Sequence, residues 1–491
     1  MKNKKIFATL LLLPLLGGLV SCNSDLSSEG SGNGSQNSGG GNSSVVDPAD
    51  GLPIYFWHTS GQTVTTELEN IIEDFEALVL ENEGKKINII LQYQGSYDDQ
   101  LQKITTAFST GDQPTLAIAY PDHVAEYLSL EDTPGQYVQD LSEYIDDPEI
   151  GFGKEEWIGD GAATDFVEAF YDEGSGYAKE GIYSLPIMKS TEVMYYNATV
   201  VVPLAMEYNE ELTTESRVQK WLDSLSWGEF MDFCRYIRDQ GGLDGLEWPC
   251  FYDSDSNLYI TQSMQKEIPF LSYKADGKGS VDFNNDQAKS MVRELKALYD
   301  EKLLCTKGTT GEYGSNYFTQ EQCVFDIGSS GGAGYNYPTG GGFEVGVCRV
   351  PAFNKDNALY VTQGLTATIL KARDDTDGSK ALYAFKFLKY LTSTDVNTQI
   401  CVNGSEGYVP VRKSCYETPL FETFISSGEL IGNVADIVTG DINGNYFNTP
   451  CFKGSATARD AVGGIITQVF AGEKTIDEAF SDAENTTLNQ M

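Results

Sequence analysis

Hydrophobic positions in the first third of the chain alternate between two spacings, which predicts an α/β fold. Short apolar runs are typical of buried strands, and apolar positions three and four residues apart are typical of helices with one buried face. The expected elements are strands at 54–57, 88–93 and 115–120 and helices at 65–79 and 98–108. This alternation predicts a parallel sheet with right-handed crossovers. Because ligands gather at the carboxyl ends of such strands, the loops after Trp57, Tyr93 and Tyr120 are candidate binding positions.

The same patterns continue toward the C-terminus. They predict strands at 181–186 and 193–196 and helices at 227–240, 288–301, 381–391 and 459–470. The glycine-rich stretch 328–342 reads as a loop, and it lacks the Gly-Lys-Ser/Thr ending of a phosphate-cradling nucleotide loop. A nucleotide site is therefore not expected there.

The N-terminus carries an export signal. Lys2, Lys4 and Lys5 precede an apolar run at 6–16, and Leu-Val-Ser-Cys ends at Cys22. This segment resembles the lipobox of bacterial lipoproteins, which implies a signal peptide at 1–21 and a lipid on Cys22. The Gly, Ser and Asn-rich tract that follows predicts a disordered linker over 22–51. A single transmembrane anchor is the alternative, but the apolar run falls short of the roughly 20 residues that span a bilayer.

Composition limits the possible partners. The chain has 33 basic and 72 acidic residues, a formal net charge of −39, which argues against nucleic acid as a partner. Hydrophobic residues make up 41% of the chain, enough for a sizeable core, and the length after the linker suits two domains.

Catalytic and metal-binding patterns are sparse. The chain has only two histidines, His58 and His123, and no pattern typical of a zinc site. Residues 253–257 place oxygen ligands at alternate positions but lack the glycine and later glutamate of a calcium loop. We therefore expect no metal and no cofactor. Eight cysteines besides Cys22 are even in number, and their spacing predicts no particular disulfide.

Several fragments together resemble the family-1 extracellular solute-binding proteins of ABC importers. They lie at 56–59, 93–97, 111–114, 185–186, 190–191, 195–197, 407–410 and 471–475. The resemblance implies a two-lobed, periplasmic-binding-protein-like (Venus-flytrap) α/β fold with hinge strands between the lobes. It implies a first lobe of 52–189 plus 329–367 and a second lobe of 190–328 plus 368–491, with crossings near Ser190, Ser329 and Ala367. Closure around a ligand would be a hinge motion.

Within that family the chain is most similar to the glycerol-3-phosphate-binding proteins. The resemblance assigns the phosphate end of the ligand to Tyr97, Ser190, Ser329, Gly364, Tyr408 and Arg459, and packing on the glycerol to Trp227. At Pro121 the chain departs from the pattern, because the glycerol binders carry a glutamate there that receives the hydroxyls. Asp122, the next residue along the chain, is the candidate to replace that glutamate, and it is less well supported than the other assigned residues.

The chemistry of these residues suits an anion. Hydroxyl donors and one arginine are what a phosphate requires, and glycine allows close backbone approach. A cation in the first turn of a helix, where Arg459 is expected, is disfavoured unless an anion binds there or an acid such as Asp460 pairs with it. For the other candidates a structural role is the alternative to ligand binding. It is packing for the aromatic residues and turn or strand geometry for the serines and Gly364.

These inferences predict a receptor that captures glycerol 3-phosphate or a glycerophosphodiester and delivers it to an ABC permease. It would be a monomer, anchored by lipid to the outer face of the cytoplasmic membrane. The same receptor with a sugar or oligosaccharide ligand is the alternative, since Trp57, Tyr93, Trp248, Tyr335 and Tyr337 could stack on sugar rings. A lipid-anchored extracellular hydrolase and an adhesin or scaffold are more distant alternatives.

Overall fold

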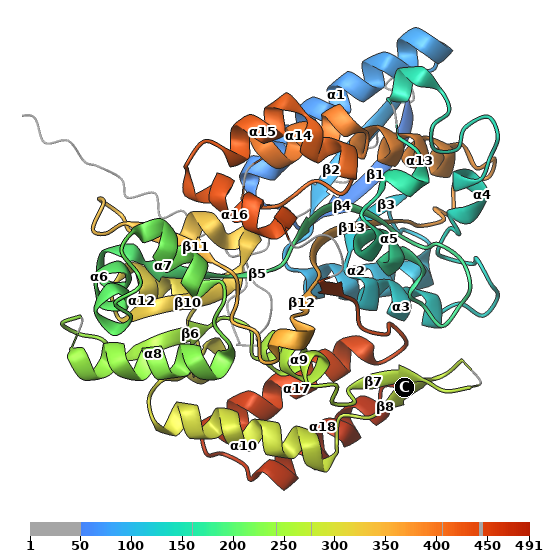
Figure 1. Cartoon of the computed structure of the whole chain (residues 1–491). Helices are drawn as coiled ribbons and strands as arrows, with labels where there is room; N and C mark the ends of the chain where they lie inside the picture. The colour runs from blue at the N-terminus through green and yellow to red at the C-terminus, as the bar shows by residue number, and fades with distance from the viewer. Residues whose placement is uncertain (1–50, 160, 242, 276, 405, 441–444) are drawn as a thin grey trace, which may run out of the picture.

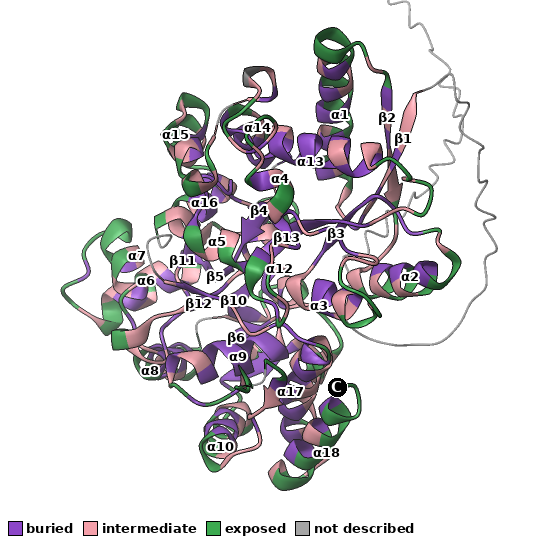
Figure 2. Ribbon diagram, turned by 90° about the vertical axis from the view of Figure 1, so that its right-hand side faces the viewer, coloured by how far each residue is buried: buried purple, intermediate pink, exposed green. Residues whose placement is uncertain are grey.

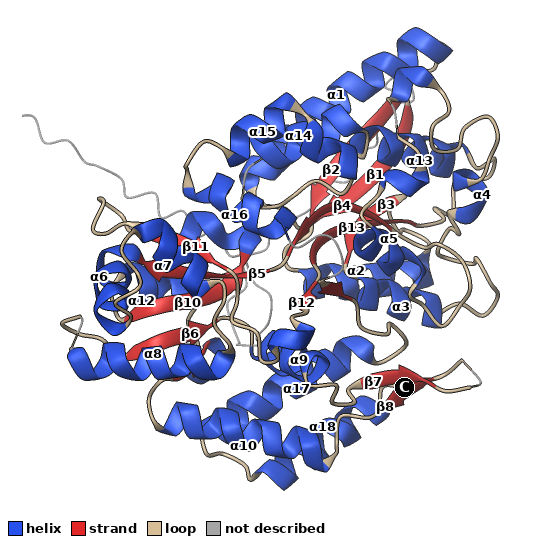
Figure 3. Ribbon diagram, in the orientation of Figure 1, coloured by secondary structure: helices blue, strands red, loops and turns tan. Residues whose placement is uncertain are grey.

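The computed structural model describes residues 51–491 apart from 160, 242, 276, 405 and 441–444. The expected signal peptide, Cys22 and almost all of the expected linker lie outside the described residues. Two five-stranded sheets organise the fold, and helices surround both of them (Figure 1, Figure 3). Within the described part, none of the helices has the length and apolar character needed to cross a membrane.

The first sheet has the order β2-β1-β3-β13-β4. Its strands are β1 (Leu52–His58), β2 (Ile87–Tyr93), β3 (Leu116–Ala119), β4 (Leu185–Ser190) and β13 (Gln363–Ile369). As the sequence predicts, β1 is parallel to both β2 and β3. Strand β13 inserts antiparallel between β3 and β4, a pairing of distant segments that no local pattern indicates.

Side chains of β3 alternate between two cores, one on each face of the first sheet. Leu116 and Ile118 pack with α1 (Gln62–Glu83) and α13 (Ser379–Leu391). Ala117 and Ala119 face the other core, with α2 (Tyr97–Thr110) and α3 (Pro121–Ser129). This strand is buried on both faces, as a strand covered by helices on both sides is, and Figure 2 shows its buried position.

The second sheet has the order β11-β5-β10-β6-β9. Its strands are β5 (Glu192–Asn197), β6 (Trp248–Tyr252), β9 (Leu304–Thr306), β10 (Cys323–Ser329) and β11 (Val345–Cys348). Small two-stranded sheets pair β7 (Leu271–Tyr273) with β8 (Gly279–Val281) and β12 (Tyr360–Val361) with β14 (Tyr446–Phe447).

The remaining helices are short to medium in length. In the first lobe and beside the linking segments they are α4 (Ser142–Ile145), α5 (Glu168–Asp172), α14 (Thr394–Asn403), α15 (Pro419–Ile425) and α16 (Leu430–Gly440). In the second lobe they are α6 (Ala198–Tyr208), α7 (Glu215–Leu222), α8 (Trp227–Gln240), α9 (Asp255–Gln265), α10 (Asp286–Asp300), α11 (Lys307–Thr310), α12 (Gly314–Thr319), α17 (Ser455–Phe470) and α18 (Ile476–Leu488).

The chain passes directly from one sheet to the other after β4. Strand β4 ends at Ser190 and β5 begins at Glu192, so only Thr191 lies between the two sheets. The expected crossing near Ser190 is therefore present. A second crossing joins β12 to β13 across Thr362, and a third lies between α15 and α16, because α16 packs against β11.

Two expected domain boundaries are wrong. Strand β11 pairs antiparallel with β5, so the chain stays in the second lobe beyond Ser329, and Ala367 lies inside β13 rather than at a crossing. Helices α13 and α14 pack on the first lobe, although 368–491 was assigned to the second. The physical reason is burial of the apolar face of α13 against the first sheet. The ring centroid of Phe387 in α13 lies 6.1 Å from that of Phe56 in β1.

Candidate functional site

Tyrosines of the first lobe meet at the carboxyl ends of its parallel strands. Tyr97 begins α2, whose start is fixed by a capping box between Ser96 and Asp99, and Tyr120 follows β3. The two rings stack with centroids 4.0 Å apart and an interplanar angle of 19°. His123 contacts both rings edge-on. Two of the three loops expected to bind ligand thus meet at this point.

Burial keeps these hydroxyls protonated. It raises the pKa of Tyr97 to about 12, against the opposing effect of hydrogen bonds to Thr59 and Tyr120. The pKa of Tyr120 is raised well above its usual value by burial, and the neighbouring Tyr97 and Tyr408 raise it further. Both phenols are therefore neutral donors at any physiological pH.

Tyr408 brings the first lobe against the second. Its loop is held by Val409, which pairs with Lys189 of β4. A Cβ added to Gly331 would lie 2.9 Å from Cζ of Tyr408, so the ring lies directly over the backbone of the glycine-rich turn at 330–336. A side chain at residue 331 would displace the ring.

Ser329 lies at the start of the same turn. Its hydroxyl accepts a hydrogen bond from the backbone N–H of Gly331 at 3.2 Å, and its carbonyl accepts one from the Tyr195 hydroxyl at 2.9 Å. The backbone N–H of Ser330 in turn donates to the carbonyl of Thr191 at 2.7 Å. The turn is thereby fastened to the link between the two sheets.

Ser190 and Gly364 are neighbours on adjacent strands. Gly364 has a φ of +100°, and a Cβ there would lie 2.9 Å from the backbone nitrogen of Ser190. The close approach of β13 to β4 therefore accounts for a glycine at position 364, because a larger residue would collide with the backbone of β4. Beside it, Oε1 of Gln363 is buried without a hydrogen-bond partner.

Arg459 reaches from α17 into a buried polar network of the second lobe. Its guanidinium donates to Oδ1 of Asn257, and Nδ2 of Asn257 donates to Glu192 at 2.9 Å. The Tyr252 hydroxyl donates to the other oxygen of Glu192 at 2.5 Å. Burial raises the pKa of Glu192 to about 7, although these hydrogen bonds and Arg459 act against the shift.

The expected position of Arg459 within its helix is wrong. Gly454, in the left-handed conformation, precedes the helix, so α17 begins at Ser455 and Arg459 lies in the second turn rather than the first. The dipole argument is weaker there, because the effect fades beyond the first turn. The charge of Arg459 nonetheless lowers the pKa of Tyr120 in the opposite lobe, so the two side chains are near one another.

Five of these residues form what we call the interlobe cluster. They are Tyr97, Tyr120 and Tyr408 of the first lobe and Ser329 and Arg459 of the second. Asp122 lies beside the cluster in the first turn of α3, where its charge raises the pKa of Tyr120 and its Oδ1 accepts from the His123 N–H at 3.0 Å.

Trp227 lies elsewhere. It begins α8 after the capping box of Ser226 and Glu229, and its ring packs on Phe353 with centroids 4.4 Å apart. Only 7% of Trp227 is exposed, and it belongs to the core of the second lobe. Its ring contacts are with the core phenylalanines Phe230 and Phe353, and its indole Nε1 is buried without a hydrogen-bond partner, so the expected glycerol contact stays a prediction.

Sequence reasoning missed several polar groups at this place. Nδ1 of His58, the last residue of β1, and Oγ of Ser60, in the loop that follows, are buried without a hydrogen-bond partner, and burial lowers the pKa of His58 to about 4. Glu406 approaches the N-terminus of α1, where a Cβ on Gly61 would lie 2.8 Å from its carboxylate, and burial raises the pKa of Glu406. The strand-end rule indicated this loop, but no pattern singled out its residues.

No metal centre is visible in the described residues, where no three His, Cys, Asp or Glu side chains are grouped to hold an ion. The eight cysteines outside the N-terminal segment are all free and buried. Burial raises the pKa of Cys234, Cys250 and Cys323 well above the usual range, so these thiols are protonated and unreactive.

Comparisons with known proteins agree with this architecture. Residues 70–424 match the family model described as bacterial extracellular solute-binding protein. The sn-glycerol-3-phosphate-binding periplasmic protein UgpB of Escherichia coli (strain K12) is 21% identical over 378 residues, covering 74% of this chain and 75% of that protein.

Solved structures show the same fold. UgpB from Mycobacterium tuberculosis in complex with glycerophosphocholine superposes with a TM-score of 0.65 at 15% identity, over 89% of this chain and 98% of that one. Maltose-bound MalE3 of T. maritima superposes with a TM-score of 0.63 at 15% identity, over 90% and 100%. These likenesses confirm the predicted two-lobed α/β fold.

The family model covers more than half of the chain, and its members bind solutes outside the cytoplasm rather than transforming them. The prediction of a binding protein rather than an enzyme is thereby confirmed. The chain belongs to the bacterial extracellular solute-binding protein family.

Proposed function

We propose that this protein is the receptor of an ABC importer and that it captures glycerol 3-phosphate or a glycerophosphodiester at the interlobe cluster. The receptor would be tethered to the outer face of the cytoplasmic membrane by lipid on Cys22, and it would act as a monomer that delivers its ligand to permease subunits. The observation that carries the proposal is the meeting of Tyr97, Tyr408 and Arg459 around Tyr120 from both lobes.

The chemistry of the cluster suits a phosphate. Neutral hydroxyls donate hydrogen bonds to an anion without repelling it, and the arginine guanidinium can donate two parallel hydrogen bonds to a phosphate. Hydrogen bonds to a charged group contribute about 1.5–3 kcal/mol each, so four or five of them are enough for micromolar affinity after the costs of association. Two relatives of this fold are named for glycerol 3-phosphate or hold glycerophosphocholine, which supports the ligand class.

A sugar or oligosaccharide is the second candidate, and exposed aromatic rings favour it. Tyr93, the last residue of β2, is 59% exposed, and Tyr335 in the turn at 330–336 is 47% exposed. Tyr335 is near the cluster, because it contributes electrostatically to the raised pKa of Tyr408. Such rings stack on sugar faces, and MalE3 is a maltose-bound example of the fold.

A thermal-shift and calorimetric panel tests the two candidates. The full chain, left unlipidated by Cys22→Ser, is measured with glycerol 3-phosphate, glycerophosphocholine, inorganic phosphate, maltose and maltotriose. A ligand at a hundredfold excess over its Kd adds about 2.7 kcal/mol of apparent stability. We expect stabilisation by the two glycerophosphates, and stabilisation by sugars alone would replace the proposal with the second candidate.

Arg459→Ala identifies the site. We expect it to weaken glycerophosphocholine binding about 10- to 100-fold, because a charge-assisted donor to the phosphate is lost. Arg217→Ala, which removes an exposed arginine of α7, is the matched control and leaves affinity unchanged. Equal affinity in Arg459→Ala would show that the phosphate is not held at this cluster.

A further inference from the structure

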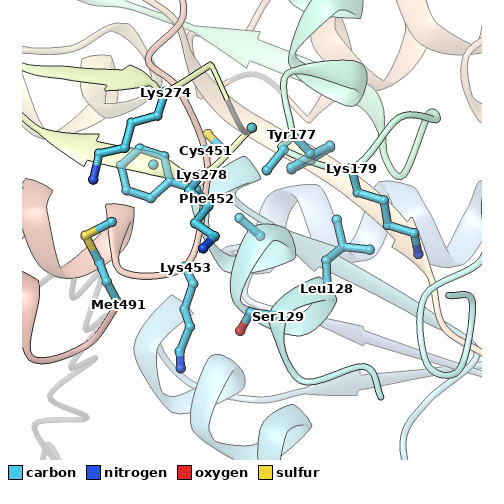
Figure 4. A pocket seen from close by; sticks show the side chains of 14 residues that line it. Leu128, Ser129, Tyr177, Lys179, Lys274, Lys278, Cys451, Phe452, Lys453 and Met491 are labelled. Carbon is cyan, nitrogen blue, oxygen red and sulfur yellow. The ribbon is translucent and has the colours of Figure 1, made fainter. Parts of the chain in front are cut away.

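A pocket lies where the two lobes meet beside the C-terminus (Figure 4). Its volume is about 370 Å³, within the range of small-molecule sites. The first lobe contributes residues 125, 128 and 129 of α3 and residues 177–179, and the second contributes residues 274, 277–279, 451–453 and Met491. None of these lining residues belongs to the interlobe cluster.

The wall of this pocket is apolar. Leu128 and Ala125 project from α3, Tyr177 from the segment before β4, and Phe452 and Met491 from the second lobe. A ligand with a hydrocarbon or aromatic body would bury its surface against these side chains. Transfer of apolar surface from water contributes roughly 25 cal/mol per Å².

The charge around the pocket has the opposite sign to that of the chain. Four lysines line it and, among the lining residues that the structure describes, no acidic side chain does, although the chain carries 72 acidic and only 33 basic residues. The four are Lys179, Lys274, Lys278 and Lys453. Lys179 forms an ion pair with Glu131 at 2.8 Å, and Lys274 and Lys453 are exposed and extend to different sides in Figure 4.

Direct contacts between the lobes hold this region together. The Tyr273 hydroxyl lies 2.7 Å from the Gly176 carbonyl and 2.9 Å from the Cys451 carbonyl. Glu126 of α3 accepts a hydrogen bond from the backbone N–H of Gly454, at the start of α17, at 2.6 Å. The walls of the pocket therefore come from both lobes at a place where they already touch.

We propose that this pocket binds a small amphipathic anion, with an apolar body between α3 and Phe452 and a carboxylate or phosphate near Lys274 and Lys453. Such a ligand contacts both lobes at once. By linkage, it favours whichever arrangement of the lobes closes the pocket.

Calorimetry with decanoate and decyl phosphate on the full Cys22→Ser chain tests the proposal, and the two probes distinguish the head groups. The double variant Lys274→Gln/Lys453→Gln is expected to bind either probe about tenfold more weakly, because two nearby cations are lost. The control Lys154→Gln/Lys220→Gln removes the same charge from exposed positions outside the pocket and is expected to bind like the parent.

A second variant tests the apolar wall without changing charge. Ser129 is exposed at the rim of the pocket, and Ser129→Trp is expected to fill the pocket and abolish binding while the melting temperature stays near that of the parent. Decanol, which lacks the charge, is expected to bind more weakly than decanoate. Absence of decanoate binding, equal binding by decanol, or unchanged binding in either pocket variant would overturn the proposal.

The same variants separate this pocket from the interlobe cluster. Lys274→Gln/Lys453→Gln keeps every residue of the cluster, so glycerophosphocholine still binds in the absence of decanoate if the proposed function is right. Arg459→Ala keeps every lysine of the pocket and is expected to bind decanoate like the parent. Failure of one site in these measurements is therefore distinguishable from failure of the other.

Discussion

The first lobe presents neutral hydroxyls to the interlobe cluster, whereas the second presents a network of ionisable groups. Tyr97, Tyr120 and Tyr408 are phenols that burial keeps protonated. Across from them, Arg459 is linked through Asn257 to Glu192. The phenols of the first lobe therefore keep one protonation state over a wide pH range, whereas Glu192 of the second lobe changes its charge near neutral pH.

In the proposed binding of an anion, this difference separates two tasks. Stacked, buried phenols fix the positions of donors at little electrostatic cost. The network of the second lobe sets how much positive charge Arg459 presents, because an ionised Glu192 partly neutralises it. Perturbed acids of this kind gather at functional sites, and here the shift has an identifiable cause in burial.

The largest effect is expected when the titrating group of the second lobe, Glu192, is replaced. Burial raises the pKa of Glu192 in the folded state above its unfolded value of 4.5 to about 7. The folded state then holds a proton that the unfolded state has lost, so this contribution to stability falls as pH rises from 4.5 through 7. Glu192→Gln removes the titration, and relative to the parent it is expected to gain up to about 3 kcal/mol between pH 4.5 and pH 8.

Urea denaturation at the two pH values measures this gain. Glu210→Gln, at an exposed position in the turn after α6, neutralises an acid of the same type and is the control, with a change near zero. If the parent and Glu192→Gln lose stability in parallel, Glu192 does not titrate in this range.

A smaller effect is expected when the link between the two charges is cut. Asn257→Ala leaves one oxygen of Glu192 and the guanidinium of Arg459 without their buried partner, which costs about 1–3 kcal/mol of stability. Thermal or urea unfolding at pH 6 measures it. Asn209→Ala, just after α6 and outside the network, is the comparison. A loss no greater than in Asn209→Ala would mean that water replaces Asn257 at no cost.

The smallest effect is expected when one neutral hydroxyl of the first lobe is removed. Tyr97→Phe keeps the stacked ring and removes only the hydroxyl, so we expect a two- to tenfold loss in affinity for glycerophosphocholine, equivalent to about 0.5–1.5 kcal/mol. Calorimetry at pH 6 and pH 8 measures it, and Tyr208→Phe on the exposed face of α6 is the control. The loss is expected to be the same at both pH values, and a pH-dependent loss would contradict the division between the two sides.

Local patterns predicted the elements well. The apolar spacing placed α8 at the residues where it is found and α13 within two residues, and the strand-end rule indicated the loops after Tyr93 and Tyr120, which meet at the interlobe cluster. Each of these depends on residues close together in the chain. Their energetics are local, so a single sequence reveals them.

Long-range pairing could not be predicted in the same way. Strand β13 lies between β3 and β4 across more than 170 residues, and α13 returns to the first lobe, which is why the expected domain boundaries failed. The network of Glu192, Asn257 and Arg459 joins three segments whose individual patterns look ordinary. Trp227 packs on Phe353, which is 126 residues away, so its surroundings could not be predicted from the local pattern.

Thr191 has a mechanical consequence. With one residue between β4 and β5, the two sheets are joined almost as one continuous ribbon. A long flexible tether would let the lobes explore many orientations, each of which ligand capture would have to exclude at an entropic penalty. A taut joint restricts them to rotation about a few backbone torsions, so the receptor samples few misaligned arrangements before it engages its cargo.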